Sequence, residues 1–251
     1  MTGGKWTGEG ENNLLTCQGT ILACQGIMFF AMTDVIAEHN NITMQQNSTA
    51  QDGRALLCDN ISNSVVVTGC DFSFNEITAT NNRAMRVRGS QTGGGYLGVT
   101  IHDNLIHNIR ETGRLAAIHF GENDVSLDVD TGAQVYNNIL ELNDGNGIVA
   151  ANASGITNHD NTVTCIGGNC AAAGYFAFTD YLGSYGNGTD IIVKDTTLPG
   201  GFGNAVMVCG PPGNPAYACS AGGTTTTSAT VCNTGTVVGN GTITVNNPPC
   251  P

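Results

Sequence analysis

The chain has 251 residues, of which 11% are charged and 35 are Gly, and its formal net charge is −12. Gly and β-branched Thr are poor helix formers and Asn prefers turns, so this composition argues against a helical protein. Because it contains only eight Lys and Arg, the chain has few groups that could neutralise phosphates, which argues against nucleic acids and anionic membranes as partners.

Residues 1–34 are predicted to form an N-terminal cap and the first coil of a repeat protein. The start is polar and Gly-rich and contains the single Trp, Trp6. An apolar run follows at residues 26–32, but a membrane-spanning helix needs about 20 apolar residues. We therefore predict no membrane span.

Residues 35–210 carry an irregular repeat with the pattern apolar, any, polar, Asn-like, any, apolar, any, apolar. Clear copies begin at Ala37, Val67, Ile101 and Val135, and looser copies lie at 157–163 and 193–198 and, beyond this range, at 238–245. The Asn-like positions are Asn40, Cys70, Asn104, Asn138, Asn161, Thr196 and Gly241. The apolar positions two residues later are Ile42, Phe72, Ile106, Leu140, Val163, Leu198 and Ile243. This alternation has the period of a β-strand, interrupted at a residue suited to a bend.

A second apolar run follows each copy, at residues 54–58, 83–87, 114–118 and 147–151. Two or three strands therefore recur per unit, and loops of different length make the repeat irregular. Strands of successive units would lie about 4.8 Å apart, so that equivalent Asn side chains form a ladder. An antiparallel β-sandwich is the alternative, but it gives no reason for an Asn at one place in each unit.

The repeat resembles that of the parallel β-helix proteins of the pectin-lyase-like superfamily over roughly residues 35–210. The resemblance implies an all-β, single-stranded, right-handed parallel β-helix with irregular loops and disulfide-stapled ends. The pectate lyases of this superfamily combine calcium with basic residues, and its polygalacturonases use Asp in short motifs. Neither set has a residue-by-residue match here, so the resemblance predicts a fold rather than an activity.

Residues 211–251, rich in Thr, Pro and Cys, are predicted to form a C-terminal cap or an assembly segment. The alternation at 242–245 indicates a further strand. This segment could close its own rod or add to a neighbouring copy, which would stack molecules end to end into a filament.

The ten cysteines contain no metal-knuckle spacing and are predicted to form disulfides in an oxidising compartment. Pairing of neighbours along the chain gives Cys17–Cys24, Cys58–Cys70, Cys165–Cys170, Cys209–Cys219 and Cys232–Cys250. Buried free thiols are the alternative for Cys58 and Cys70. Acceptor sites for N-glycosylation occur at Asn41, Asn47, Asn60, Asn152, Asn187 and Asn240. Both features favour a secreted, extracellular or cell-surface location.

A ligand site is predicted where the second strands align Asp59, Arg88, His119 and Asn152, with Arg86 beside Arg88. Arg could bind a sugar carboxylate through two hydrogen bonds, and a base could remove the proton α to it. Solvated strand ends are the alternative interpretation.

Three arginines, Arg54, Arg83 and Arg114, are expected to share another column. Stacked like charges are destabilising. Either an anionic ligand or local pairing with Asp52, Glu76 or Glu111 would offset them.

The acidic stretch at 122–130 contains Asp124, Asp128 and Asp130 on alternating positions of an extended segment. Oxygen-rich clusters of this kind suit Ca²⁺. A solvated loop without bound calcium is the alternative.

The leading hypothesis is a non-enzymatic extracellular β-helix, structural, adhesive or self-assembling, that contacts polysaccharide. It combines the repeat with the lack of a complete catalytic motif. The alternative is a polysaccharide lyase acting on uronate-containing polymers at Arg86, Arg88 and His119.

Overall fold

The computed structural model describes part of the chain. The described ranges are 2–7, 12–17, 25–46, 54–60, 66–80, 83–89, 95–110, 116–120, 130–143, 145–151, 153–166, 176–181, 191–194, 204–209, 228–232, 237–239 and 242–245. Side chains are described from residue 26 to residue 166 with gaps. In these ranges every regular element is a β-strand and every strand pair is parallel, as an all-β repeat predicts.

The strands form four parallel sheets. Sheet A has the order β1 (Thr2–Thr7), β4 (Thr33–Glu38), β8 (Cys70–Ser73), β12 (Thr100–His102), β16 (Gln134–Tyr136), β20 (Thr157–His159), β23 (Ile191–Lys194), β25 (Ser228–Cys232) and β27 (Thr242–Val245). Sheet B has the order β2 (Asn12–Cys17), β5 (Asn41–Gln46), β9 (Glu76–Thr80), β13 (Leu105–Arg110), β17 (Ile139–Leu142) and β21 (Thr162–Cys165).

Sheet C has the order β3 (Gln25–Phe30), β6 (Arg54–Asp59), β10 (Arg83–Arg88), β14 (Ala116–Phe120), β18 (Asn146–Ala151), β22 (Phe176–Tyr181), β24 (Asn204–Cys209) and β26 (Val237–Gly239). The small sheet D contains β7 (Val67–Thr68), β11 (Tyr96–Leu97), β15 (Asp130–Thr131) and β19 (Ala153–Ser154).

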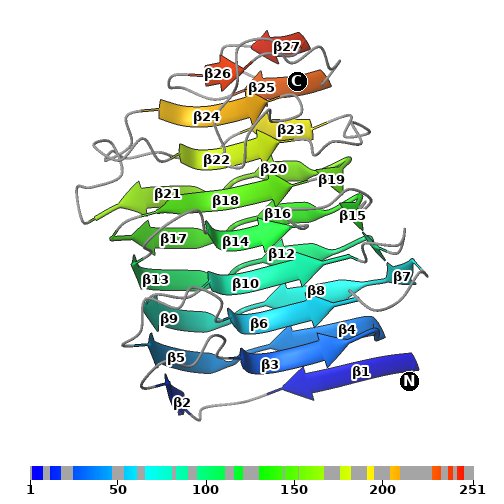
Figure 1. Cartoon of the computed structure of the whole chain (residues 1–251), viewed down its shortest axis with the longest axis vertical. Helices are drawn as coiled ribbons and strands as arrows, with labels where there is room; N and C mark the ends of the chain where they lie inside the picture. Colours follow the sequence, from blue (N-terminus) through cyan, green and yellow to red (C-terminus); the bar gives the residue numbers. More distant parts are fainter. Residues whose placement is uncertain are drawn as a thin grey trace.

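The chain visits the sheets in a fixed order. From β7 to β22 each pass runs through sheets D, A, B and C, and the next pass adds one strand to each sheet. We call one such pass a coil. Figure 1 shows the coils stacked along the long axis, with β1 at one end and β27 at the other. Strands from the expected cap at 1–34 and from residues 211–251 therefore join the same sheets as the central strands.

The core lies between the sheets and is built from alternate strand positions. In β17, Leu140 and Leu142 are buried while Ile139 is exposed. The buried positions stack in register, because Ile106 pairs with Leu140 and Leu140 with Val163. Burying each such side chain contributes about 1.5–3 kcal/mol. The predicted placement of Ile106 above Leu140 is confirmed.

Two predicted columns contain a wrong member. Asn75, and not Cys70, lies between Asn40 and Asn104, while Ile77, and not Phe72, pairs with Ile42 and Ile106. Residues 72–79 fit the repeat pattern, with an Asn at the bend, except at the third place, where Phe74 stands instead of a polar residue. The predicted copy that begins at Val67 is wrong, because Val67 lies in β7 of sheet D, which comes before the strands of the repeat in this coil.

The last predicted copy is assigned to the wrong sheet. Ile243 pairs with Ala229 in sheet A, so it does not continue the sheet B column of Ile106 and Leu140. Thr196 and Leu198 lie outside the described residues.

A buried asparagine ladder links successive coils at the bend between sheets A and B. Each Nδ2 donates to the Oδ1 of the next Asn, over 2.8 Å from Asn40 to Asn75, 3.0 Å to Asn104, 2.9 Å to Asn138 and 2.9 Å to Asn161. Backbone N–H groups of four of these residues, Asn40, Asn75, Asn104 and Asn138, donate to the same oxygen atoms. The ladder thus satisfies buried backbone groups where the strands end.

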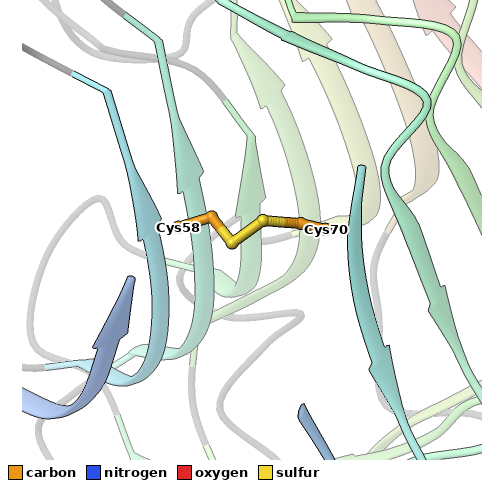
Figure 2. Close-up of a disulfide and its surroundings, with 2 residues drawn as sticks. All are labelled: Cys58 and Cys70. Carbon is orange, nitrogen blue, oxygen red and sulfur yellow. A yellow bond between two sulfur atoms is a disulfide. The ribbon is translucent and has the colours of Figure 1, made fainter. Parts of the chain in front are cut away.

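The predicted disulfide between Cys58 and Cys70 is present. It joins β6 of sheet C to the start of β8 in sheet A, with the two Cα atoms 6.7 Å apart (Figure 2). Both residues are buried, as either interpretation predicts, but they are bonded to each other, so the free-thiol alternative is wrong for this pair. Cys165 is also disulfide-bonded. The other predicted pairs each include a residue outside the described ranges: Cys24, Cys170, Cys219 or Cys250.

Among the described residues, no helix has the length and apolar character needed to cross a membrane.

Candidate functional site

The predicted ligand residues lie on sheet C, in a register that differs from the expected one. Arg88 pairs with Asp59 as predicted, but His119 pairs with Arg86 rather than with Arg88. Asn152 lies outside the described residues. Asp59, Arg86, Arg88 and His119 alternate with core residues along their strands, so they belong to the outer face of the sheet.

The outer face is covered at most of these positions, although Met28 and Phe30 of β3 on the same face are exposed. Arg86 is 2% exposed and His119 is 0% exposed, and Asp59 is buried as well. Arg88, the most exposed member, donates from Nε to Asp59 Oδ1 over 3.1 Å and forms a salt bridge to Oδ2. We call these four residues the covered polar layer. The sequence placed polar side chains on this face correctly, but it did not show that the chain covers them.

The predicted arginine column is partly present. Arg54 and Arg83 pair in adjacent strands, and both are buried. Arg114 lies outside the described residues. The register of Met85 with Ile118 aligns Arg83 with Ala116, two residues before Ile118.

The predicted calcium site falls largely outside the described ranges. Asp124 and Asp128 are not described, and only the backbone of Asp130, in β15, is described. In the part of the chain with described side chains, no group of three or more His, Cys, Asp and Glu could hold a metal ion.

Two of the predicted glycosylation sites have described side chains. Asn60 is fully buried, whereas Asn41 lies on the outer face of sheet B, where its Nδ2 contacts Glu76 Oε2 at 3.4 Å. Asn47, Asn152 and Asn187, with Asn240, lie outside the described residues.

The exposed side of the asparagine ladder carries a row of stacked rings. We call this row the ring stripe; it consists of His39, Phe74, His102, Tyr136 and His159. Ring centroids of neighbours are 5.1, 5.6, 4.8 and 5.2 Å apart along this order. Three pairs are stacked with nearly parallel ring planes, and Phe74 meets His102 edge to face. The rings come from five successive coils, so the stripe runs along the stack.

The bend places two of the five rings, those of His39 and Phe74, on a left-handed backbone, while the other three rings belong to the strand residue just before it. In each coil the residue just before the ladder Asn has a positive φ of 53–57°: His39, Phe74, Asp103, Asn137 and Asp160. Asn, Asp and His tolerate this left-handed conformation, but for a bulky residue it is an outlier. Phe74 adopts it with a φ of 55° and is 49% exposed. The fold therefore holds an aromatic ring outside the core in a strained conformation.

Carboxylates contact two of the three imidazoles of the stripe, those of His102 and His159. His102 Nδ1 lies 2.7 Å from Asp103 Oδ2, and its Nε2 lies 3.4 Å from Asp71 Oδ1. His159 Nδ1 lies 2.6 Å from Asp160 Oδ2. These contacts fix the orientation of both rings.

Tyr136 stacks between the two imidazoles. Burial raises the pKa of its phenol, and the nearby charges of Asp103 and Asp71 raise this pKa further. Both causes favour the neutral phenol.

Comparison with protein families, characterised proteins and solved structures finds no match for this chain.

The ring stripe escaped the sequence analysis, although the sequence contains its signal. A His, Phe or Tyr occurs one or two residues before the ladder Asn in five consecutive coils. The signal is weak because the ring residues differ in type and lie either one or two residues before the ladder Asn. The ring residues form a column only when the coil that contains β8 and β9 is aligned on Asn75 rather than on Cys70.

Proposed function

We propose that the protein is a right-handed parallel β-helix of the pectin-lyase-like type that acts outside the cell as a structural or adhesive module and contacts polysaccharide through the ring stripe. The sheet order and the parallel register support the solenoid. The buried disulfide supports an oxidising location, because such bonds persist mainly in secreted and cell-surface proteins.

Phe74 is the observation that carries the contact role. A ring 49% exposed adds little to the core, and its left-handed backbone costs about 1–2 kcal/mol for an ordinary L-residue. Asn at the equivalent position of another coil, Asn137, avoids this cost. A strained and exposed aromatic residue is typical of a binding surface, where an apolar ring packs against a partner.

The stripe suits an extended polymer better than a small molecule. Its rings lie on one line over five coils, and the stacked side chains keep this line rigid. The exposed edges of the stacked rings offer van der Waals contact to a sugar chain, while the phenol of Tyr136 and the carboxylates that hold the imidazoles offer hydrogen bonds.

The polysaccharide lyase alternative has less support from the geometry. A uronate lyase needs a positive group to neutralise the sugar carboxylate and a free base for the α proton. Arg86 and His119 lie in the covered polar layer. On the exposed face, both ring nitrogens of His102 face carboxylate oxygens.

Binding to insoluble polysaccharides tests the proposed contact. Phe74→Asn removes the ring and introduces the residue that the same column already has at Asn137. Leu97→Thr is the matched control, because Leu97 is exposed on sheet D and its register neighbours are Thr68 and Thr131. We expect Phe74→Asn to lose binding and Leu97→Thr to retain it. Equal binding by all three proteins would contradict the contact role, and release of unsaturated sugars would favour the lyase.

Self-assembly by end-to-end stacking is a second candidate function. Sheets A and C extend from the first coil to the last with all strands parallel, from β1 to β27 and from β3 to β26. A second copy could continue both sheets in the same direction, and such head-to-tail contacts produce filaments. Negative-stain microscopy should then show rods longer than one molecule, whereas monodisperse particles would exclude this candidate.

A further inference from the structure

The ring stripe lies in an acidic surface. Asp71, Asp103 and Asp160 contact its imidazoles, and Glu76 lies 3.4 Å from the neighbouring His107. Glu76 and Asp160 are exposed, and Asp71 and Asp103 are partly exposed. The carboxylates therefore reach solvent beside the rings.

Positive side chains are missing from the strands that carry the ring stripe. Strands β4, β8, β12, β16 and β20, with the bend residues that follow each of them, contain no Lys or Arg. Lys194 of the next strand, β23, pairs in register with His159 at one end of the stripe. Three of the arginines with described side chains lie in β10 and the fourth in β6, both in sheet C. From β4 to β16 the exposed face near the stripe thus has a negative field that repels anionic ligands and attracts cationic ones.

The imidazoles leave part of each carboxylate available. His102 uses Oδ2 of Asp103, and His159 uses Oδ2 of Asp160. An ionised carboxylate has two oxygens and about four acceptor sites. Each of these aspartates can therefore hold its imidazole and accept a hydrogen bond from a ligand N–H at the same time.

The two aspartates repeat along the stack. Asp103 and Asp160 occupy the same left-handed bend position two coils apart, with Asn137 between them. At about 4.8 Å per coil they lie about 10 Å apart along the axis. A ligand with several ammonium groups along an extended chain can engage both, and the second contact is then intramolecular and stronger than the first alone.

From this arrangement we infer that the ligand of the ring stripe is a cationic amino-sugar polysaccharide, whose C–H groups pack on the rings while its ammonium groups bind Asp103 and Asp160. This inference rests on the proposed polysaccharide contact and specifies its ligand class.

The test uses chitosan, its N-acetylated counterpart chitin, and a polyuronate, each as an insoluble matrix. Chitosan and chitin share a backbone, so the comparison isolates the positive charge. The charge variant is Asp103→Asn with Asp160→Asn, which keeps the left-handed bend because Asn137 already adopts it. The control is Glu141→Gln, which removes a partly exposed carboxylate from sheet B.

We expect the wild-type protein to bind chitosan more tightly than chitin, and binding to weaken as salt is raised. The double variant should bind chitosan at least about threefold more weakly, since each exposed ion pair contributes modestly, and Glu141→Gln should bind like wild type. Phe74→Asn should weaken binding to both matrices.

Each contrary outcome has a separate meaning. Binding that depends on Phe74 but is equal on chitin and chitosan, unchanged in the double variant, or strongest on polyuronate would overturn the cationic ligand and leave the contact role in place. No binding to any matrix, or binding that ignores Phe74, would overturn the contact role and this inference together.

Discussion

Asn104 donates a hydrogen bond from Nδ2 to Oδ1 of Asn138 over 2.9 Å, and both side chains are buried. The same Oδ1 accepts the backbone N–H of Asn104 at 3.1 Å. Asn138 in turn donates to the backbone oxygens of Ile101 and Tyr136, each at 3.0 Å. One side chain therefore satisfies buried polar groups of its own coil and of the coil beside it.

Replacing Asn138 with Ala should strongly destabilise the fold. The change leaves several buried donors and acceptors unsatisfied, and each costs about 1–3 kcal/mol. We expect a loss of at least about 2 kcal/mol in urea unfolding. Asn137→Asp is the control, because Asn137 is exposed and Asp103 and Asp160 occupy its column; it should change stability by less than about 0.5 kcal/mol. Equal effects of the two substitutions would remove the ladder from the stabilising contacts.

Substitutions along β17 test which face of sheet B is buried. Leu140 lies in the core, while its neighbour Ile139 is 47% exposed. Leu140→Ala should cost about 2–5 kcal/mol through lost burial and the cavity that remains. Ile139→Ala should cost under about 1 kcal/mol, since its side chain already contacts water. Thermal unfolding of both variants decides, and a reversed order would mean that the strand faces the other way.

The buried disulfide should resist reduction in the folded protein. Cys58 and Cys70 are 0% and 1% exposed, so a reductant reaches the bond only after unfolding. We expect thiol titration to detect these two cysteines only when denaturant is added with the reductant. The double variant Cys58→Ala and Cys70→Ala should lose about 2–5 kcal/mol. Rapid reduction without denaturant would show that this part of the core opens readily.

Phe74→Asn should leave stability unchanged or raise it. Asn adopts the left-handed conformation more easily than Phe, so the substitution recovers a cost of about 1–2 kcal/mol. It also removes ring contacts worth about 0.5–1.5 kcal/mol, and the two effects roughly cancel. Phe74→Val is the contrasting variant: a β-branched residue keeps the strain and loses the ring. We expect Val to melt below wild type and Asn not to, by differential scanning calorimetry. A large destabilisation by Phe74→Asn would mean that the ring stabilises the folded protein rather than serving as a binding surface.

The sequence predicted the parallel stack because its alternation and its bend residue recur in each coil. Ile106 above Leu140 and Asn104 above Asn138 follow from that recurrence. Alignment failed at Cys70, where the short strand β7 shifts the repeat. The pattern contains only the strands of the repeat, so it cannot show that an extra strand, β7 of sheet D, comes before β8 in this coil. Asn75 therefore did not align with the other ladder residues, and neither did Phe74, which precedes it.

The candidate site was harder to predict, because exposure depends on the whole coil stack. Arg86 and His119 are polar residues on an outward strand position, yet they are buried. Nothing in the sequence around His102 and His159 marks them as site residues. Their shared role becomes visible only in the structure, where both rings stack on Tyr136 of the coil between them. Periodicity predicts which way a side chain points along a strand, but it does not predict what covers the sheet.

Tyr136 provides a prediction for alkaline pH. Its pKa is raised above the ordinary 10.0, first by burial and then by Asp103 and Asp71. The folded protein thus holds the phenolic proton more tightly than the unfolded chain does. The resulting stability is fully present below pH 10 and falls as the pH rises from 10 through the folded pKa. Tyr136→Phe cannot ionise and should lose less stability over that range. Absorbance titration of tyrosinate in both proteins checks the assignment: their difference should show one phenol that ionises above pH 10, and a difference centred at or below pH 10 would contradict it.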